Sequence, residues 1–114
     1  MSIKIATTLY HADWCGYCKT FMPEWNTFTK NITGGALTIP GVKLSCETIE
    51  DTQLTKSGKK ALIGGKPIKG YPTVKITVTS GATSKEIEYQ GKRNSTELIS
   101  FMKILADRER SGPA

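Results

Sequence analysis

The segment Asp13-Trp14-Cys15-Gly16-Tyr17-Cys18 places two cysteines three residues apart near the start of this 114-residue sequence. It directly follows residues 3–10, whose β-branched and aromatic side chains predict a strand. After it, apolar side chains from Cys18 to Ile32 follow the i, i+3, i+4, i+7 spacing of one helical face. The sequence therefore predicts a strand, the cysteine pair and a helix to about Asn31, in immediate succession.

A cysteine in the first turn of a helix is chemically activated. Unpaired backbone N–H groups and the helix dipole stabilise an anion at this end, and such sites lower a thiol pKa from ~8.5 to between ~3.5 and ~7.5. We interpret Cys15 as the nucleophilic thiol and Cys18, one turn later, as its disulfide partner. In this interpretation Gly16 permits the tight turn between them, and Trp14 offers an apolar surface to a docking polypeptide.

The rest of the chain predicts a mixed sheet. Strands are expected at 42–48, 73–79 and 85–89, with a turn at 80–83 that makes the last two a hairpin. Helices are expected at 50–63 and from Asn94 or Ser95 onward, the Gly/Pro-rich residues 66–72 are expected to be irregular, and residues 108–114 to form a frayed tail. The expected fold is α/β, in the order β-α-β-α-β-β-α. It is a single domain over residues 1–114, with a mixed four-stranded sheet and helices on both faces.

Composition excludes several classes of protein. The chain has 16 Lys and Arg against 10 Asp and Glu, a formal charge of +6, and 38% hydrophobic residues, values ordinary for a globular domain. Its basic residues are scattered and no RNA-binding or zinc-finger motif accompanies them, so we expect no nucleic-acid partner. No run of 18 apolar residues predicts a membrane span. Because the first residues also lack a signal peptide, we expect a monomer of the cytoplasm or of a virion interior, without a membrane partner.

The cysteines have other interpretations. His11, Cys15, Cys18 and Cys46 offer four zinc ligands on paper, but no second ligand pair with the usual spacing is present. A purely structural disulfide across two residues would remove little unfolded-state entropy. We therefore favour redox exchange and expect no metal and no cofactor. Cys46 itself is interpreted as a small buried side chain, or as an intermolecular disulfide former if its strand lies at the sheet edge.

Three blocks of the sequence resemble known proteins. Residues 14–19 and Pro23-Glu24-Trp25 are similar to the active-site helix of thioredoxins and, more closely, of protein disulfide isomerase domains. Gly70-Tyr71-Pro72-Thr73 resembles the second signature of these families, in which a cis proline faces the cysteine pair. Residues 89–93, with Glu97-Leu98, resemble the last strand and helix of isomerase domains.

This resemblance implies a minimal thioredoxin fold and a thiol–disulfide oxidoreductase that acts on protein disulfides. Cys15 would attack the substrate and Cys18 would resolve the mixed disulfide. The expected substrate-binding residues are Trp14, Gly16, Tyr17, Tyr71 and Pro72. The partners would be protein disulfides or dithiols, together with an electron donor or acceptor that the sequence leaves open.

The chain departs from these families in three ways. They carry another strand and helix before the cysteine pair, so this chain is expected to be an N-terminally truncated domain or a fragment. Leu9 occupies the position of a buried acidic residue, and the segment 46–71 is longer than in isomerase domains. Two alternatives stay open: a glutathione-linked, glutaredoxin-like enzyme, although the glycine–aspartate element that would bind glutathione is absent, and an adaptor whose redox activity is incidental.

Overall fold

A four-stranded mixed sheet forms the centre of the computed structural model, which describes residues 2–58 and 60–111. The strands run in the order β2-β1-β5-β6 across the sheet. Their bounds are β1 Ile3–His11, β2 Val42–Glu50, β5 Thr73–Ser80 and β6 Thr83–Glu88. β1 pairs in parallel with β2 and antiparallel with β5, and β5 and β6 form an antiparallel hairpin. The mixed four-stranded sheet and the order of its strands and helices are confirmed. A further two-stranded hairpin is inserted before β5, and it includes Lys66–Pro67, part of the 66–72 segment that is predicted to be irregular.

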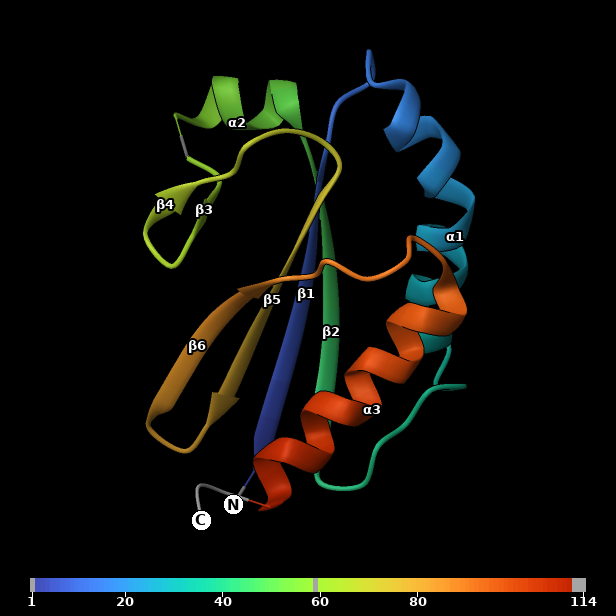
Figure 1. Cartoon of the computed structure of the whole chain (residues 1–114), viewed down its shortest axis with the longest axis vertical. Coiled ribbons are helices and arrows are strands. Elements are labelled where there is room, and N and C mark those ends of the chain that lie inside the picture. Colours follow the sequence, from blue (N-terminus) through green and yellow to red (C-terminus); the bar gives the residue numbers. More distant parts are fainter. Residues whose placement is uncertain (1, 59, 112–114) are drawn as a thin grey trace.

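Two long helices, α1 (Gly16–Thr33) and α3 (Ser95–Ser111), lie on one side of the sheet (Figure 1). Their apolar faces and the facing strand residues form the core, in which the largest fully buried side chains include Ile5, Leu9, Phe21, Trp25, Phe28, Leu98 and Met102. Two polar contacts fix the layers: the Trp25 indole N–H donates to Thr48 Oγ1 at 2.8 Å, and the Ser95 N–H donates to Glu24 Oε1 at 2.8 Å. Helix α1 is thereby tied both to β2 and to the start of α3.

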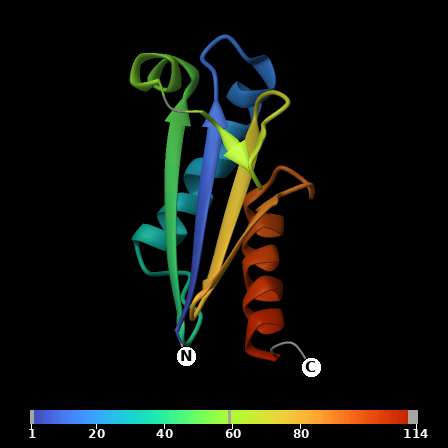
Figure 2. The same cartoon turned by 90° about the vertical axis from the view of Figure 1, so that its left-hand side faces the viewer.

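The opposite side of the sheet is covered by fewer and shorter elements. The short helix α2 (Asp51–Ser57) and the small hairpin of β3 (Leu62–Ile63) and β4 (Lys66–Pro67) lie there (Figures 1 and 2). α2 contributes no buried side chain. The strand residues that face this side are mostly small or polar, as side chains alternate along a strand; they include Lys4, Ala6, Thr8, Ser45, Thr77 and Thr79. Such a surface needs no apolar layer over it.

The segment after β2 differs from the prediction of one helix over 50–63. The helix ends at Ser57 because Gly58 takes the left-handed conformation at its C-terminus. Leu62 and Ile63 then pair with residues 66–67 across Gly64 and Gly65, which both have positive φ values (58° and 82°). Two successive positive φ values suit a tight two-residue hairpin, so these glycines make a turn and not a helix end.

The last helix is longer than predicted. Asn94 caps it as expected, since its Oδ1 accepts from the Glu97 N–H at 2.8 Å. The helix continues to Ser111, so the predicted frayed tail is wrong for residues 108–111, while residues 112–114 lie outside the described part of the chain. Glu109 forms an ion pair with Lys85 at 3.4 Å, and the Arg110 guanidinium donates to the Pro40 C=O. These contacts hold the final turns against the sheet.

Candidate active site

The cysteine pair lies at the start of α1, at the end of the sheet where β1 stops (Figure 1). Cys15 is the N-cap residue, and its Sγ accepts a hydrogen bond from the Cys18 N–H at 3.2 Å. Both thiols are free in the structure, and Cys15 and Cys18 are 5% and 1% exposed. The predicted placement of the pair at a helix N-terminus is therefore what the structure has, with the thiols sheltered from solvent.

The two thiols differ in acidity. Burial opposes ionisation of Cys15, but hydrogen bonds from Cys18 and from backbone N–H groups, together with the Arg93 charge, outweigh it and lower the pKa of Cys15 below its ordinary value. Burial, followed by the hydrogen bond to Cys15 and the Cys15 charge, raises the pKa of Cys18 to about 11. Near neutral pH, ionisation of the pair therefore favours a thiolate on Cys15 and a thiol on Cys18.

The loop before β5 faces Cys15. The Cys15 Sγ lies 3.6 Å from the main-chain oxygen of Tyr71, and the Tyr71–Pro72 peptide bond is cis. The Trp14 and Tyr71 rings meet edge to face, with centroids 5.9 Å apart. The fold thus brings Trp14, Cys15 and Cys18 together with Tyr71 and Pro72, two groups of residues that are distant in the sequence.

The N-terminus of α2 holds both sides of this site. The Tyr71 hydroxyl donates to Asp51 Oδ1 at 2.7 Å, and the Asp13 N–H donates to Glu50 Oε2 at 3.3 Å. Burial, the hydrogen bond to Asp51 and the charges of both acids raise the pKa of Tyr71 to about 12. Neither acid is among the site residues predicted from the sequence. The signal was present, since Glu50 and Gln53 form a capping box that marks a helix start at this position.

Two exposed aromatic side chains flank the thiols. Trp14 and Tyr17 are 73% and 74% exposed, the largest exposures among the large apolar side chains that the structure describes. The expected role of Gly16 in a tight turn is wrong. Gly16 is not one of the glycines with positive φ, and a Cβ built on it would meet no atom within 4 Å. Its lack of a side chain instead leaves open space beside Cys15.

Leu9, His11 and Cys46 lie outside the small cluster of apolar side chains around the thiols. Leu9 is fully buried in the main core, and no carboxylate is buried among the described residues. His11 ends β1 opposite Glu50 of β2. Cys46 is half-buried against the core on β2, which is an edge strand, and burial raises its pKa. The described residues contain no group of three or more His, Cys, Asp or Glu that could hold a metal ion.

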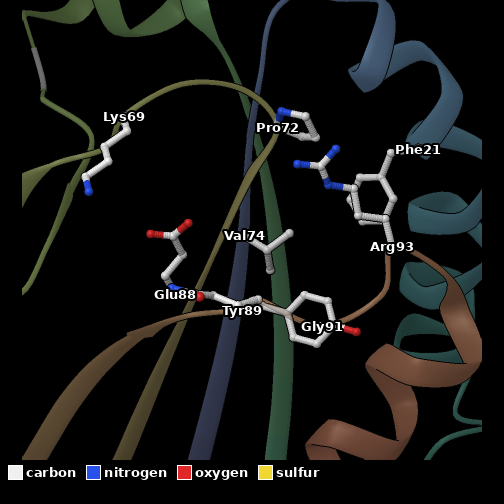
Figure 3. Close-up of a pocket in the computed structure, with 9 residues that line it drawn as sticks. Phe21, Lys69, Pro72, Val74, Glu88, Tyr89, Gly91 and Arg93 are labelled. Atoms are coloured by element: carbon white, nitrogen blue, oxygen red, sulfur yellow. The ribbon is translucent and has the colours of Figure 1, made fainter.

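A pocket opens beside Pro72, between the residue 69–74 segment and the residue 88–93 segment (Figure 3). It has a volume of about 330 Å³. Its lining residues are Phe21, Lys69, Pro72, Val74, Glu88, Tyr89, Gln90, Gly91 and Arg93. Gly91 is required there, because a Cβ at this position would lie 2.6 Å from the Tyr89 hydroxyl.

The described helices include none long and apolar enough to cross a lipid bilayer.

Comparison with known proteins agrees with this geometry. Residues 4–104 match the thioredoxin family. The chain is 30% identical over 101 residues to the probable protein disulfide-isomerase ER-60 of Schistosoma mansoni. The matched region covers 89% of this chain and 18% of that protein. It is 28% identical over 94 residues to protein disulfide-isomerase A4 of Bos taurus, which covers 82% of this chain and 12% of that protein. This chain therefore spans less than a fifth of either relative.

A solved structure with the same fold agrees with these sequence matches. The crystal structure of full-length ERdj5 superposes with a TM-score of 0.66 at 18% identity, over 92% of this chain and 14% of that chain. The chain belongs to the thioredoxin family, a family of thiol–disulfide oxidoreductases, and has protein disulfide isomerases among its relatives.

Proposed function

We propose that this protein exchanges disulfides with polypeptide substrates through Cys15 and Cys18. The observation that carries the proposal is the Cys15 thiol itself. It lies at a helix N-terminus, has a lowered pKa, and is 3.6 Å from the Tyr71 carbonyl oxygen. A nucleophilic sulfur beside a backbone hydrogen-bonding group is the arrangement that an extended polypeptide disulfide requires.

The reaction has two steps when the dithiol form reduces a substrate. The Cys15 thiolate attacks one substrate sulfur, forms a mixed disulfide, and expels the other substrate sulfur as a thiolate. Cys18 then loses its proton and attacks the Cys15 sulfur, which releases the second substrate thiol and leaves a Cys15–Cys18 disulfide. Two electrons pass to the substrate, and an external dithiol restores the pair. The reverse sequence oxidises a substrate dithiol.

The second step needs a proton acceptor for Cys18. The position of Leu9 supplies none, since its side chain is apolar and fully buried. We propose that the Cys18 proton leaves to water or to a surface group at this end of the sheet. Formation of the mixed disulfide also favours this step, because it removes the negative charge on Cys15 that helps to raise the pKa of Cys18.

The test is reduction of insulin by dithiothreitol. Wild type is expected to accelerate the reaction, Cys15→Ser to abolish the acceleration, and Cys18→Ser to accumulate mixed disulfides with the substrate. Cys46→Ser is the matched control and should keep wild-type activity, because Cys46 lies on β2 outside the thiol cluster. Wild-type protein that gives only the uncatalysed rate would contradict the proposal and favour an adaptor.

A further inference from the structure

The pocket beside Pro72 is next to the backbone that faces Cys15. Pro72 lines it, and the preceding residue, Tyr71, places its main-chain oxygen 3.6 Å from Cys15 Sγ. A polypeptide whose cysteine reacts at Cys15 while its backbone lies along residues 71–72 would direct a neighbouring side chain into this pocket. At about 330 Å³, the space is large enough for one long side chain.

The pocket has an apolar floor and a charged rim. Phe21, Val74 and Tyr89 form the floor and are each less than 10% exposed. Lys69, Glu88 and Arg93 are exposed at the rim. In Figure 3 the Arg93 guanidinium lies on the Pro72 side, whereas Lys69 and Glu88 lie across the pocket from it. A ligand side chain with an aliphatic stem and a charged tip matches this division.

The charges on the rim favour an anionic tip. Two cations face one carboxylate, and the whole chain carries a formal charge of +6. Among the described residues Arg93 acts on the two thiols through its charge but forms no hydrogen bond or ion pair, so its planar set of N–H donors is available for a carboxylate, which it matches in geometry. A positively charged tip would instead meet Arg93 at the entrance next to Pro72.

We propose that this pocket is a substrate subsite that selects a carboxylate-bearing residue next to the reacting cysteine. The inference rests on the proposed disulfide exchange and names its preferred substrates. Two sources supply the same chemistry: an acidic side chain of a polypeptide, and the carboxylates of glutathione joined to a substrate cysteine.

The test compares disulfide peptides that are identical except for the residue after the cysteine, which is Glu, Gln or Lys. We expect kcat/KM to fall from Glu to Gln to Lys by about threefold at each step at low salt, the size of one partly screened charge contact. High salt should compress the series. Oxidised glutathione is tested as a second kind of substrate. If its kcat/KM exceeds that of all three peptides, and the peptides do not differ among themselves, the carboxylate is that of glutathione. If the Glu peptide is preferred over the Gln and Lys peptides, the carboxylate is that of the substrate chain.

Charge variants locate the effect. Lys69→Glu should reduce the advantage of the Glu peptide about threefold, and Glu88→Lys should increase it by a similar factor. Lys103→Glu changes the net charge equally on exposed α3, away from the pocket lining, and should leave the preference unchanged. The subsite would be overturned if the Glu peptide, the Lys peptide and oxidised glutathione had equal kcat/KM values. If the same protein still reduced insulin, the proposed function would stand. Loss of insulin reduction by wild type would overturn the function itself.

Discussion

The Tyr71 hydroxyl donates a 2.7 Å hydrogen bond to Asp51 Oδ1, which joins the loop facing the nucleophile to the first residue of α2. The neighbouring Glu50 carboxylate accepts from the Asp13 N–H just ahead of the cysteine pair. Adjacent acids thus hold the two backbone segments between which a substrate would enter. Their role is one of positioning, because neither carboxylate is hydrogen-bonded to a thiol.

Breaking the Tyr71–Asp51 bond should impair substrate use more than thiol chemistry. Tyr71→Phe removes the donor but keeps the ring against Trp14, so we expect kcat/KM for a peptide disulfide to fall about threefold to tenfold, in line with the ~0.5–1.5 kcal/mol of one ordinary hydrogen bond. The rate of Cys15 alkylation should stay near wild type. Asp51→Asn keeps an acceptor oxygen and should restore most of the activity that Asp51→Ala loses. Parallel losses in alkylation would instead indicate a disturbed α1.

The phenol of Tyr71 offers a direct spectroscopic test of the same contact. Burial and the Asp51 carboxylate together raise its pKa to about 12. Because a nearby negative charge disfavours the phenolate, Asp51→Ala should lower this pKa toward the ordinary value of ~10. Tyrosine-labelled NMR through an alkaline titration measures it. An unchanged midpoint in the variant would mean that Asp51 does not contact the phenol in solution.

Alkylation should separate the two active-site thiols by pH. The pKa of Cys15 is lowered and that of Cys18 is raised to about 11, and only a thiolate reacts rapidly. We expect the iodoacetamide rate of reduced protein to rise with pH through the lowered Cys15 pKa and to reach its plateau below the pH at which an ordinary thiol ionises. Acidification below that pKa should stop the reaction. Mass spectrometry that finds Cys18 modified first at neutral pH would reverse the assignment.

Arg93 should influence both thiols through its charge. Its guanidinium lowers the pKa values of Cys15 and Cys18, although it is the smallest of the named contributions to each. Arg93→Gln should therefore raise both pKa values and slow turnover at neutral pH, while Arg93→Lys keeps the charge and most of the effect. Ultraviolet thiolate absorbance followed through a pH titration measures this. Added salt should weaken the difference, because Arg93 is exposed.

The contact between α1 and β2 should carry measurable stability. Trp25→Phe removes the indole N–H that donates to Thr48 and leaves space in a site that is 1% exposed. We expect the free energy of unfolding to fall by about 1–3 kcal/mol, from one hydrogen bond and a small cavity. Thr48→Val removes only the acceptor and makes no cavity at Trp25, but it leaves the indole N–H of this buried side chain unpaired, so a similar loss of about 1–3 kcal/mol is expected. Urea denaturation measures both, in a Cys15→Ser, Cys18→Ser background that lacks the active-site thiols.

Local patterns made much of the fold predictable. The apolar periodicity from Cys18 to Ile32 and the cap residue Asn94 each specify a helix by short-range chemistry, and both helices begin within three residues of where they were expected. Gly64 and Gly65 directly follow the helix that the sequence predicts over 50–63, and a pair of glycines fits either a helix terminus or a hairpin turn. Only the pairing of residues 62–63 with 66–67 distinguishes the two.

The active site was predictable in its reacting atoms and less so in its support. Cys15 and Cys18 reveal themselves by spacing at a helix start. The contacts of Asp51 with Tyr71 and of Glu50 with Asp13 join residues 20 and 37 positions apart and depend on how α2 is placed beside the sheet. The final turns of α3 likewise depend on distant partners, Lys85 and Pro40, which no local pattern identifies.

The placement of the two ends of the fold has a mechanical consequence. β1 begins at Ile3 and α3 finishes at Ser111, both at the end of the sheet away from Cys15 (Figure 1). A tether attached at either end would therefore leave the thiols facing outward and free to swing toward a large client. Flanking segments joined at Ile3 and Ser111 would enter and leave the domain on the side opposite the cysteine pair, so they would not cover it.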